Sequence, residues 1–310
     1  MTQKYRLVTR SDLDGIVCAA LLKEIGMVNE VKFAHPKDMQ DGTVEITAND
    51  IITNLPYHPA AHMVFDHHAS EAERNKTPAK NLVNDPTAPS AAHVVYRHFG
   101  GAERFPNISH DLMNAADKID SAQLSREEIL NPRGWVLLGF IMDNRTGLGR
   151  FHNFRVSNYQ LMMELVDVLR RIKDAEGILE HPDVAERVKL YHEHATLAHD
   201  QVTRCAKVHG QCLVIDLRQE KEIYALNRFA IYALYPQINL SMHVMPGKQG
   251  VNTVFALGKS VLNRSSTLDV GSLMLEYGGG GHKAVGTCQI ANDKADTVKQ
   301  ELIQRITKTG

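Results

Sequence analysis

The sequence predicts an α/β protein with an N-terminal domain built on a doubly wound parallel sheet, a helical linker, and a smaller C-terminal α/β domain with a mixed sheet. Its 310 residues are enough for two domains that each bury a core. Short apolar segments rich in strand-forming residues alternate with segments of helical apolar spacing, which is typical of such sheets. One long helical segment, Val184–Cys205, separates two alternating regions, so we expect domains at residues 1–195 and 207–310.

Four short strands are expected in the first domain, with a buried helix, Ile16–Ile25, after the first of them. The strands cover residues 5–9, 31–34, 50–56 and 62–65, and Pro56 ends the third. Asp12 and Asp14 lie in the turn after the first strand, Asn54 lies at the end of the third, and Asp66 follows the fourth. The carboxyl ends of parallel strands meet at one edge, where such sheets bind ligands, so we expect these side chains to share a site.

The residue types at this edge have the chemistry of a metal site. A neutral imidazole of Asp66-His67-His68 can bind a divalent metal, and the neighbouring carboxylate can fix its tautomer. Asp12 and Asp14, two residues apart, can converge on one cation. Each motif also has a plain structural interpretation, as a helix cap with a turn acid or as a polar loop with two histidines. Only the combination argues for a site.

The middle of the chain is predicted to be mostly helical. The expected helices cover residues 90–99, 108–120, 135–142 and 158–172. Between the last two, the loop 143–150 carries two glycines and two arginines. Arg145 in this loop either contacts a phosphate or lies in a solvated turn, and the sequence favours neither.

The second domain again alternates between strand-like and helical segments. We expect strands at residues 212–217, 239–245, 251–257 and 284–290, and helices at 223–234 and 270–277. The run Gly278–Gly281 precedes His282. Four glycines without side chains allow a polyanionic ligand to approach the backbone N–H groups, and His282 can donate to a phosphate oxygen.

Composition narrows the class of protein. With 43% hydrophobic and 23% charged residues, the chain is typical of globular proteins. The net charge of −1 argues against charge-driven binding of long nucleic acid. No signal peptide and no membrane span are expected, and the four cysteines lie far apart, without metal-type spacing. We therefore expect a cytoplasmic protein with reduced thiols that does not bind a membrane.

Three motifs in this order resemble the DHH phosphoesterase family with a C-terminal DHH-associated domain. They are Asp12-Leu13-Asp14-Gly15, Asp66-His67-His68 and Gly278-Gly279-Gly280-Gly281-His282, and together they span nearly the whole chain. The likeness is to the oligoribonuclease and pAp-phosphatase branch, whose members are often labelled exopolyphosphatase-like. The resemblance implies a manganese-dependent hydrolase with its site between two domains and a metal-activated water as nucleophile.

The family pattern also implies roles for single residues. Asp12, Asp14 and His67 match metal ligands, and Asp117 is the best match to a fourth carboxylate, with Asp120 as the alternative. The resemblance further implies that the second domain grips the nucleotide or phosphate end of the substrate. The residues concerned are Arg264, Gly279, Gly280, Gly281 and His282.

Two positions depart from the family pattern. Arg10 stands where a histidine ligand is expected, and Asn54 stands where a metal-bridging aspartate is expected. We therefore expect one well-held ion at Asp14, His67 and Asp117, with Mn²⁺ as first choice and Mg²⁺ or another divalent ion as alternatives. The other metal position keeps only Asp12 as a strong ligand, since Asn54 replaces the bridging carboxylate. Asp12 is either a metal ligand or the partner of Arg10, whose guanidinium takes the space of the lost metal.

These expectations lead to a functional hypothesis. The protein would be a metal-dependent phosphoesterase acting on a short phosphorylated nucleotide, either a linear dinucleotide such as pApA, or pAp. In it, Arg10 and His68 would neutralise charge on the phosphoryl oxygens, and Asp66 would orient a histidine. An exopolyphosphatase and a cyclic-dinucleotide phosphodiesterase are alternatives with the same chemistry. A non-catalytic nucleotide-binding regulator is the alternative from another class, and the sequence leaves a homodimer open.

Overall fold

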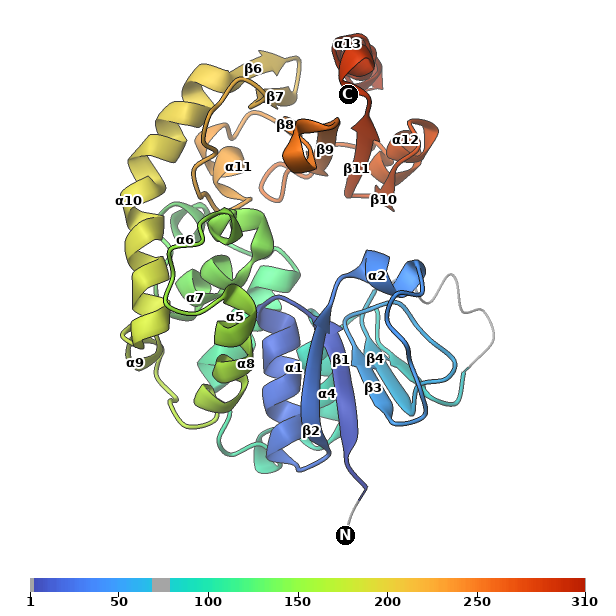
Figure 1. The fold of residues 1–310 in the computed structure, drawn as a ribbon, viewed down its shortest axis with the longest axis vertical. Helices are drawn as coiled ribbons and strands as arrows, with labels where there is room; N and C mark the ends of the chain where they lie inside the picture. Colours follow the sequence, from blue (N-terminus) through green and yellow to red (C-terminus); the bar gives the residue numbers. More distant parts are fainter. Residues whose placement is uncertain (1–2, 69–78, 310) are drawn as a thin grey trace. The chain divides into compact units, whose positions relative to one another are not determined.

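The computed structural model describes residues 3–68 and 79–309. The chain divides into two compact units, each described by itself below. The first comprises Met1–Leu124 and Asn131–Tyr191, and the second comprises Ser125–Leu130 and His192–Gly310. The division between Tyr191 and His192 falls within the long helix α10 (Pro182–Cys205; Figure 1).

The first unit is organised around a five-stranded sheet in the order β2-β1-β3-β4-β5, with every pair parallel. The strands are β1 (Tyr5–Arg10), β2 (Val28–Ala34), β3 (Asp50–Thr53), β4 (Met63–Asp66) and β5 (Leu82–Asn84). Consecutive apolar residues in its central strands are fully buried, which requires cover on both faces. They are Leu7, Val8, Ile51, Ile52, Val64 and Phe65.

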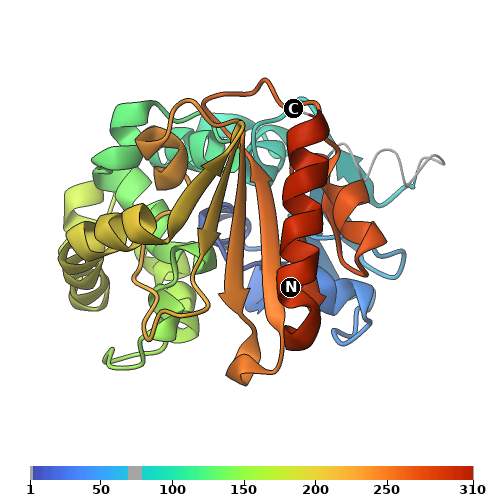
Figure 2. The ribbon, with the colours of Figure 1, turned by 90° about the horizontal axis from the view of Figure 1, so that it is seen from above.

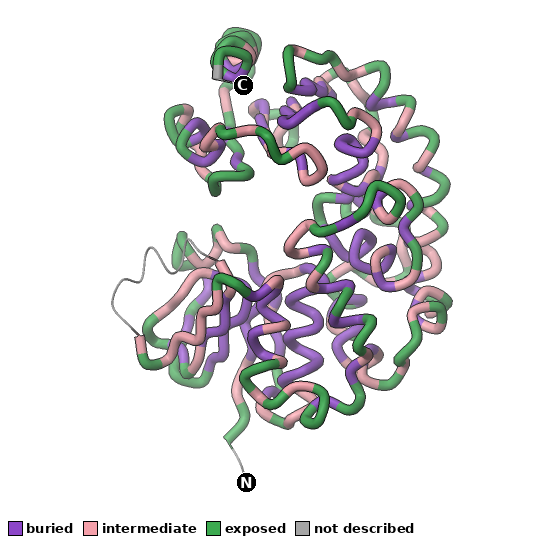
Figure 3. The backbone as a smooth tube through the Cα atoms, turned by 180° about the vertical axis from the view of Figure 1, so that it is seen from behind, coloured by how far each residue is buried: buried purple, intermediate pink, exposed green. Residues whose placement is uncertain are grey.

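Helices cover this sheet and set the position of the turn after β1. Helix α1 (Leu13–Glu24) is buried over residues 13–22, and buried backbone is drawn purple in Figure 3. It packs against β1, β2, α4, α5 and α8. Besides the first part of α10, the other helices among the described residues of the first unit are α2 (Pro36–Gln40), α4 (Ala91–His98), α5 (His110–Asp120), α7 (Gly134–Met142), α8 (Asn158–Val168) and α9 (Ala175–Leu179), with 3-10 turns at Gly101–Glu103, Asn144–Thr146 and Leu148–Arg150. An apolar helix such as α1 needs partners on all sides.

The second unit contains a six-stranded mixed sheet in the order β10-β11-β9-β8-β7-β6, in which only β7 and β8 pair in parallel. Its strands are β6 (Ala206–His209), β7 (Cys212–Asp216), β8 (Leu240–Pro246), β9 (Thr253–Lys259), β10 (Gly280–His282) and β11 (Val285–Ile290). Its helices are α6 (Arg126–Leu130), α11 (Ala230–Leu234), α12 (Val270–Glu276) and α13 (Ala295–Thr309), with 3-10 turns at Lys248–Gly250 and Asn292–Lys294. The two sheets confirm the predicted fold class.

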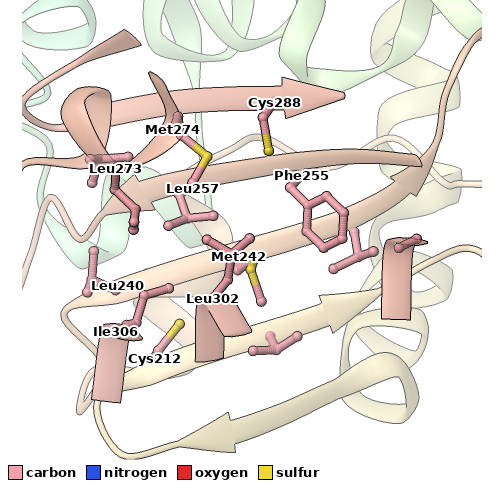
Figure 4. Packing of buried hydrophobic residues seen from close by; sticks show 14 residues of the cluster. Cys212, Leu240, Met242, Phe255, Leu257, Leu273, Met274, Cys288, Leu302 and Ile306 are labelled. Atoms are coloured by element: carbon pink, nitrogen blue, oxygen red, sulfur yellow. The ribbon is translucent and has the colours of Figure 1, made fainter. Parts of the chain in front are cut away.

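A core lies between one face of this second sheet and the helices α12 and α13. Met242 and Phe255 of the sheet pack against Met274 of α12 and Leu302 of α13 (Figure 4). Helix α13 lies along the strands (Figure 2). The opposite face packs on a second cluster that includes Val202 of α10. Both faces of the second sheet are therefore used for packing.

One expected helix of the second unit is much shorter than predicted. Residues 223–229 are irregular, and α11 begins only at Ala230. Side chains of α10 satisfy the backbone of the irregular segment: Gln201 accepts from the Tyr224 N–H, and His194 accepts from the Ala225 N–H. Because these tertiary bonds replace helical ones, the apolar spacing of the segment was misleading.

No helix among the described residues is both long enough and apolar enough to cross a bilayer.

Candidate active site

The site begins where three neighbouring strands of the first unit end together. Thr9 pairs with Thr53, and Thr53 pairs with Phe65, so the next residues along the chain are Arg10, Asn54 and Asp66. The turn after β1 is tight, because a Cβ on Gly15 would lie 1.9 Å from the Arg10 carbonyl oxygen. Only glycine fits there. This close approach explains the glycine that follows Asp14.

The two acids of this turn have different local roles. Asp12 caps α1 by accepting from the Gly15 N–H at 3.1 Å. Asp14 lies inside the helix and is buried, and both its oxygens accept from the start of α4, at 3.1 Å from the Ala91 N–H and 2.7 Å from the Ala92 N–H. The positive end of α4 thus fixes the Asp14 carboxylate and favours its charge.

The His67 ring is oriented by the backbone. Its Nδ1 lies 3.2 Å from the Ala88 carbonyl oxygen, which can only accept, so Nδ1 carries the hydrogen. This tautomer leaves the lone pair on Nε2, the atom a metal would bind. Nε2 lies 2.8 Å from Asp120 Oδ2, a distance at which the two form an ion pair when the ring is protonated. A separation of this size is also typical of two ligand atoms that bind the same ion.

Asp14, His67 and Asp120 form a compact group whose ligand atoms all lie within 4.8 Å of one another. Two carboxylates and one imidazole suit Mn²⁺ or a similar divalent ion. Asp117, the carboxylate favoured from the sequence, lies elsewhere: it accepts from the Ser90 hydroxyl at 2.6 Å and contacts His93 Nδ1 at 2.9 Å. Asp120, the alternative carboxylate, is thus the acid of α5 that lies beside the His67 ring in this group.

The buried carboxylates of Asp14 and Asp120 repel each other, and a cation between them would be favourable. Burial raises the pKa of Asp14 well above its usual range, and the nearby Asp120 raises it further. Burial also raises the pKa of Asp12. Burial opposes the charges of both His67 and Asp120, but their mutual attraction outweighs it, raising the pKa of His67 to about 9 and lowering the pKa of Asp120. A divalent ion would relieve the repulsion between the carboxylates and replace the proton on His67.

Buried polar atoms without hydrogen-bond partners gather at the same edge. Among the described residues they include both side-chain atoms of Asn54, Oδ2 of Asp66 and Nε2 of His67. Asn54 is 1% exposed and has a left-handed backbone with a φ of 54°. An unsatisfied buried polar group costs about 1–3 kcal/mol, so a polar ligand at this edge would recover considerable stability. The residues present therefore fit a bound cation.

Positive side chains adjoin the acids. Arg10 Nε lies 3.0 Å from Asp12 Oδ2. Asp143 holds Arg145 through two contacts, at 2.7 and 2.8 Å. Desolvation opposes the charge of Arg145, but Asp143, Asp12 and Asp120 together raise its pKa. His68 Nδ1 lies 2.8 Å from Asp66 Oδ1, so Asp66 orients that ring. Arg10 and Arg145 are thus both close enough to the site acids to interact with them electrostatically.

The remaining expected contacts belong to the second unit. Arg264 follows β9 and donates to the Val261 carbonyl at 3.1 Å, and Gly280 and His282 lie in β10. A Cβ on Gly279 would lie 2.0 Å from the Thr287 carbonyl oxygen, and one on Gly281 would lie 2.2 Å from that of Val285, so packing requires these glycines. A Cβ on Gly280 would meet nothing within 4 Å. The fold alone does not explain that glycine.

The supporting residues were not identified from the sequence. The turn before α4 holds His67 through Ala88, and the first turn of α4 holds Asp14 through Ala91 and Ala92. The N-cap Ser90 donates to Asp117 at this point. Backbone donors leave no signature in residue type. The only available signal was the Ser90 cap, since a serine before a helical pattern marks a helix start.

The chain is similar over its whole length to a characterised protein. It is 54% identical to a pGpG-specific phosphodiesterase, PggH, from Vibrio cholerae, with a TM-score of 0.85 over 99% of this chain and 100% of that one. The chain belongs to the DHH family of phosphoesterases. The resemblance noted from the three motifs is thereby confirmed, and the hydrolase class follows from it.

More distant structures share the fold of this DHH phosphoesterase. RecJ from Thermus thermophilus in complex with Mn²⁺ is 14% identical, with a TM-score of 0.56 over 99% of this chain and 53% of that one. CDC45 from Entamoeba histolytica is 10% identical, with a TM-score of 0.55 over 98% of this chain and 95% of that one. No protein-family model matches the chain, and no curated protein does.

Proposed function

We propose that this DHH phosphoesterase is a divalent-cation-dependent phosphodiesterase that hydrolyses short linear dinucleotides, with pGpG as the first candidate substrate. The observation that carries the proposal is the 54% identity, over the full length, to a pGpG-specific phosphodiesterase. The group of Asp14, His67 and Asp120 supplies the matching chemistry. This proposal is narrower than the sequence-based expectation, which named pApA or pAp.

The ion is proposed to bind at Asp14, His67 and Asp120, with Mn²⁺ first among the candidates. Asp12 and Asn54 lie beside this group and complete its polar surroundings. A divalent cation bound there would lower the pKa of a coordinated water towards neutrality and polarise the phosphoryl group. The contacts of Asp14 with α4 and of His67 with Ala88 hold these ligands in place before the substrate arrives.

The residues around the acids then act on the phosphodiester. The Arg10 guanidinium binds non-bridging phosphoryl oxygens and stabilises the charge that develops on them. Asp66 fixes the His68 ring, whose Nε2 we assign to the same oxygens. In the reaction, water oxygen bonds to phosphorus, the ribose O3′ leaves with a proton, and two mononucleotides are released.

Further contacts are assigned to the rest of the substrate. Arg145, whose orientation Asp143 fixes, is suited to a second phosphate. In the second unit, Arg264, His282 and the backbone at Gly279, Gly280 and Gly281 are proposed to bind the nucleotide or its terminal phosphate. The unhindered position at Gly280 supports this assignment, since a missing side chain there leaves room for a ligand.

A substrate panel tests the proposal. The metal-free protein is supplied with Mn²⁺ and mixed with pGpG, pApA, pAp, a cyclic dinucleotide or short-chain polyphosphate, and products are separated by chromatography. We expect mononucleotide from pGpG, and a loss of at least about 100-fold in His67→Ala, because the imidazole ligand is gone. His152→Ala, at an exposed histidine, is the matched control and should keep full activity.

Other outcomes would redirect the proposal. Turnover of pAp or polyphosphate without turnover of pGpG would reject the dinucleotide and keep the hydrolase. Tight binding of pGpG without cleavage, in protein that is folded and loaded with Mn²⁺, would favour a nucleotide-binding regulator.

A further inference from the structure

The carboxylate of Asp12 is already satisfied by the protein. Its Oδ1 accepts from the Gly15 N–H at 3.1 Å, and its Oδ2 lies 3.0 Å from Arg10 Nε. The guanidinium thus occupies the side of Asp12 on which a cation would otherwise bind. Unlike the neutral backbone N–H groups that bind Asp14, the Arg10 guanidinium carries a full positive charge, so an ion at Asp12 would have to displace the arginine or overcome its repulsion.

Two possible metal groups at this edge share one histidine. Among the described residues, His67 belongs both to the group with Asp14 and Asp120 and to a group with Asp66 and His68. His67 Nδ1 contacts the Ala88 carbonyl, so only Nε2 is available, and one nitrogen lone pair binds one ion. Asp66 and His68 already contact each other at 2.8 Å. The two groups cannot both hold an ion through His67.

We propose that the active site holds a single divalent cation, at Asp14, His67 and Asp120, and that Arg10 supplies the second positive centre. The inference deepens the proposed function and rests on it. It fits the balance of charge, because the three negative charges of Asp12, Asp14 and Asp120 match in number the positive charges of one divalent ion and one guanidinium. Asp66 and Arg145 each have a separate partner, His68 and Asp143.

Asn54 also disfavours a second cation at this edge. It stands between Arg10 and Asp66 at the strand ends, it is buried, and both of its polar atoms lack a partner in the described chain. As an amide it offers an oxygen and an N–H₂ group to the bound ligand without adding a negative charge. An aspartate there would add the carboxylate that a second cation requires.

Counting bound ions tests the inference without any substrate. Metal-free protein is titrated with Mn²⁺, ions per chain are counted by native mass spectrometry, and the EPR spectrum is recorded. We expect one ion per chain and the spectrum of an isolated Mn²⁺. His67→Ala should lose this ion, with an affinity at least about 100-fold lower.

A double variant, Arg10→His with Asn54→Asp, provides the decisive comparison. It replaces the guanidinium by a ligand and the amide by a carboxylate, so we expect two ions per chain and the spectrum of a magnetically coupled pair. Arg171→His, at an exposed arginine, is the matched control and should bind one ion. A His181→Ala background excludes uptake at the separate group Glu164, His181 and Asp183.

The outcomes separate an error in the number of ions from an error in the residues assigned to exclude the second ion. A coupled pair of ions in the wild-type protein would overturn the inference. A folded double variant that still binds one ion would show that Arg10 and Asn54 do not exclude the second. Because the readout is ion number, failure of pGpG turnover would refute the proposed function and leave this result unaffected.

Discussion

At the scale of residues, two carboxylates of α5 that lie three positions apart, Asp117 and Asp120, have different partners. Asp120 contacts His67 and joins the ion group, whereas Asp117 binds Ser90 and His93 at the start of α4. That helix start donates two N–H bonds to Asp14. We therefore propose that Asp117 is a positioning residue for the proposed ligand Asp14; such residues commonly change metal affinity about 10- to 100-fold.

Isosteric variants should separate these tasks. Asp120→Asn removes a charged ligand, and we expect the Mn²⁺ affinity to fall by more than about 100-fold. Asp117→Asn keeps the shape and weakens only the support, so we expect a loss of roughly 10-fold with the ion still bound. Isothermal titration of the metal-free proteins measures both. Equal losses, or the larger loss in Asp117→Asn, would contradict the assignment of Asp120 as the ligand.

At the scale of elements, the sequence predicted best where local pattern and tertiary role agree. The buried strands β1, β3 and β4 and the apolar helix α1 were visible because full burial leaves continuous apolar runs. The short strand β6 and the helix limits near Ala230 were not, since they depend on pairing with β7 and on side chains from α10. The same limit applies to the site: the motifs marked its acids, but only packing separates Asp117 from Asp120.

One ion-pair network ties α13 to β7 and makes a prediction about acid stability. Asp216, at the end of β7, contacts Arg218 and Lys299, and Arg218 also contacts Asp296 of α13. Burial opposes the charge of Asp216, but the two cations outweigh it and lower its pKa to about 2. A lowered pKa stabilises the fold above about pH 4, and this contribution is lost as the pH falls through about 2.

Replacing Asp216 should remove its contribution to the pH dependence of the free energy of unfolding. We expect Asp216→Asn to lower the free energy of unfolding by about 1–2 kcal/mol at neutral pH, and by much less at about pH 2, where the wild type has lost the same contribution. Urea unfolding followed by circular dichroism at both pH values measures the difference. The exposed pair of Lys37 and Asp41 offers the control Asp41→Asn, for which a smaller change is expected. A loss in Asp216→Asn of the same size at both pH values would argue against this ionic contribution.

At the scale of the whole molecule, the second unit uses residues that precede the predicted domain 207–310. The cluster on one face of its sheet includes Val202 of α10, while Gln201 and His194 satisfy the backbone at residues 222–225. Helix α6 joins the unit from far earlier in the sequence, with Arg126 donating to the Ala233 carbonyl and Asn227 donating to that of Ile129. The unit is therefore not equivalent to the segment 207–310.

Truncation tests this organisation. A fragment of residues 207–310 lacks Val202, Gln201 and His194, and we expect it to lose roughly 4–6 kcal/mol relative to 192–310, a large part of the stability of a domain. It should then show poor NMR dispersion and a broad urea transition, whereas 192–310 should unfold more cooperatively. Adding α6 as a separate peptide should stabilise 192–310 further if the bonds of Arg126 and Asn227 form. Equal cooperative unfolding of both fragments would mean that the sheet and α13 alone carry the fold of this unit, with the α10 contacts serving only to join it to the rest of the chain.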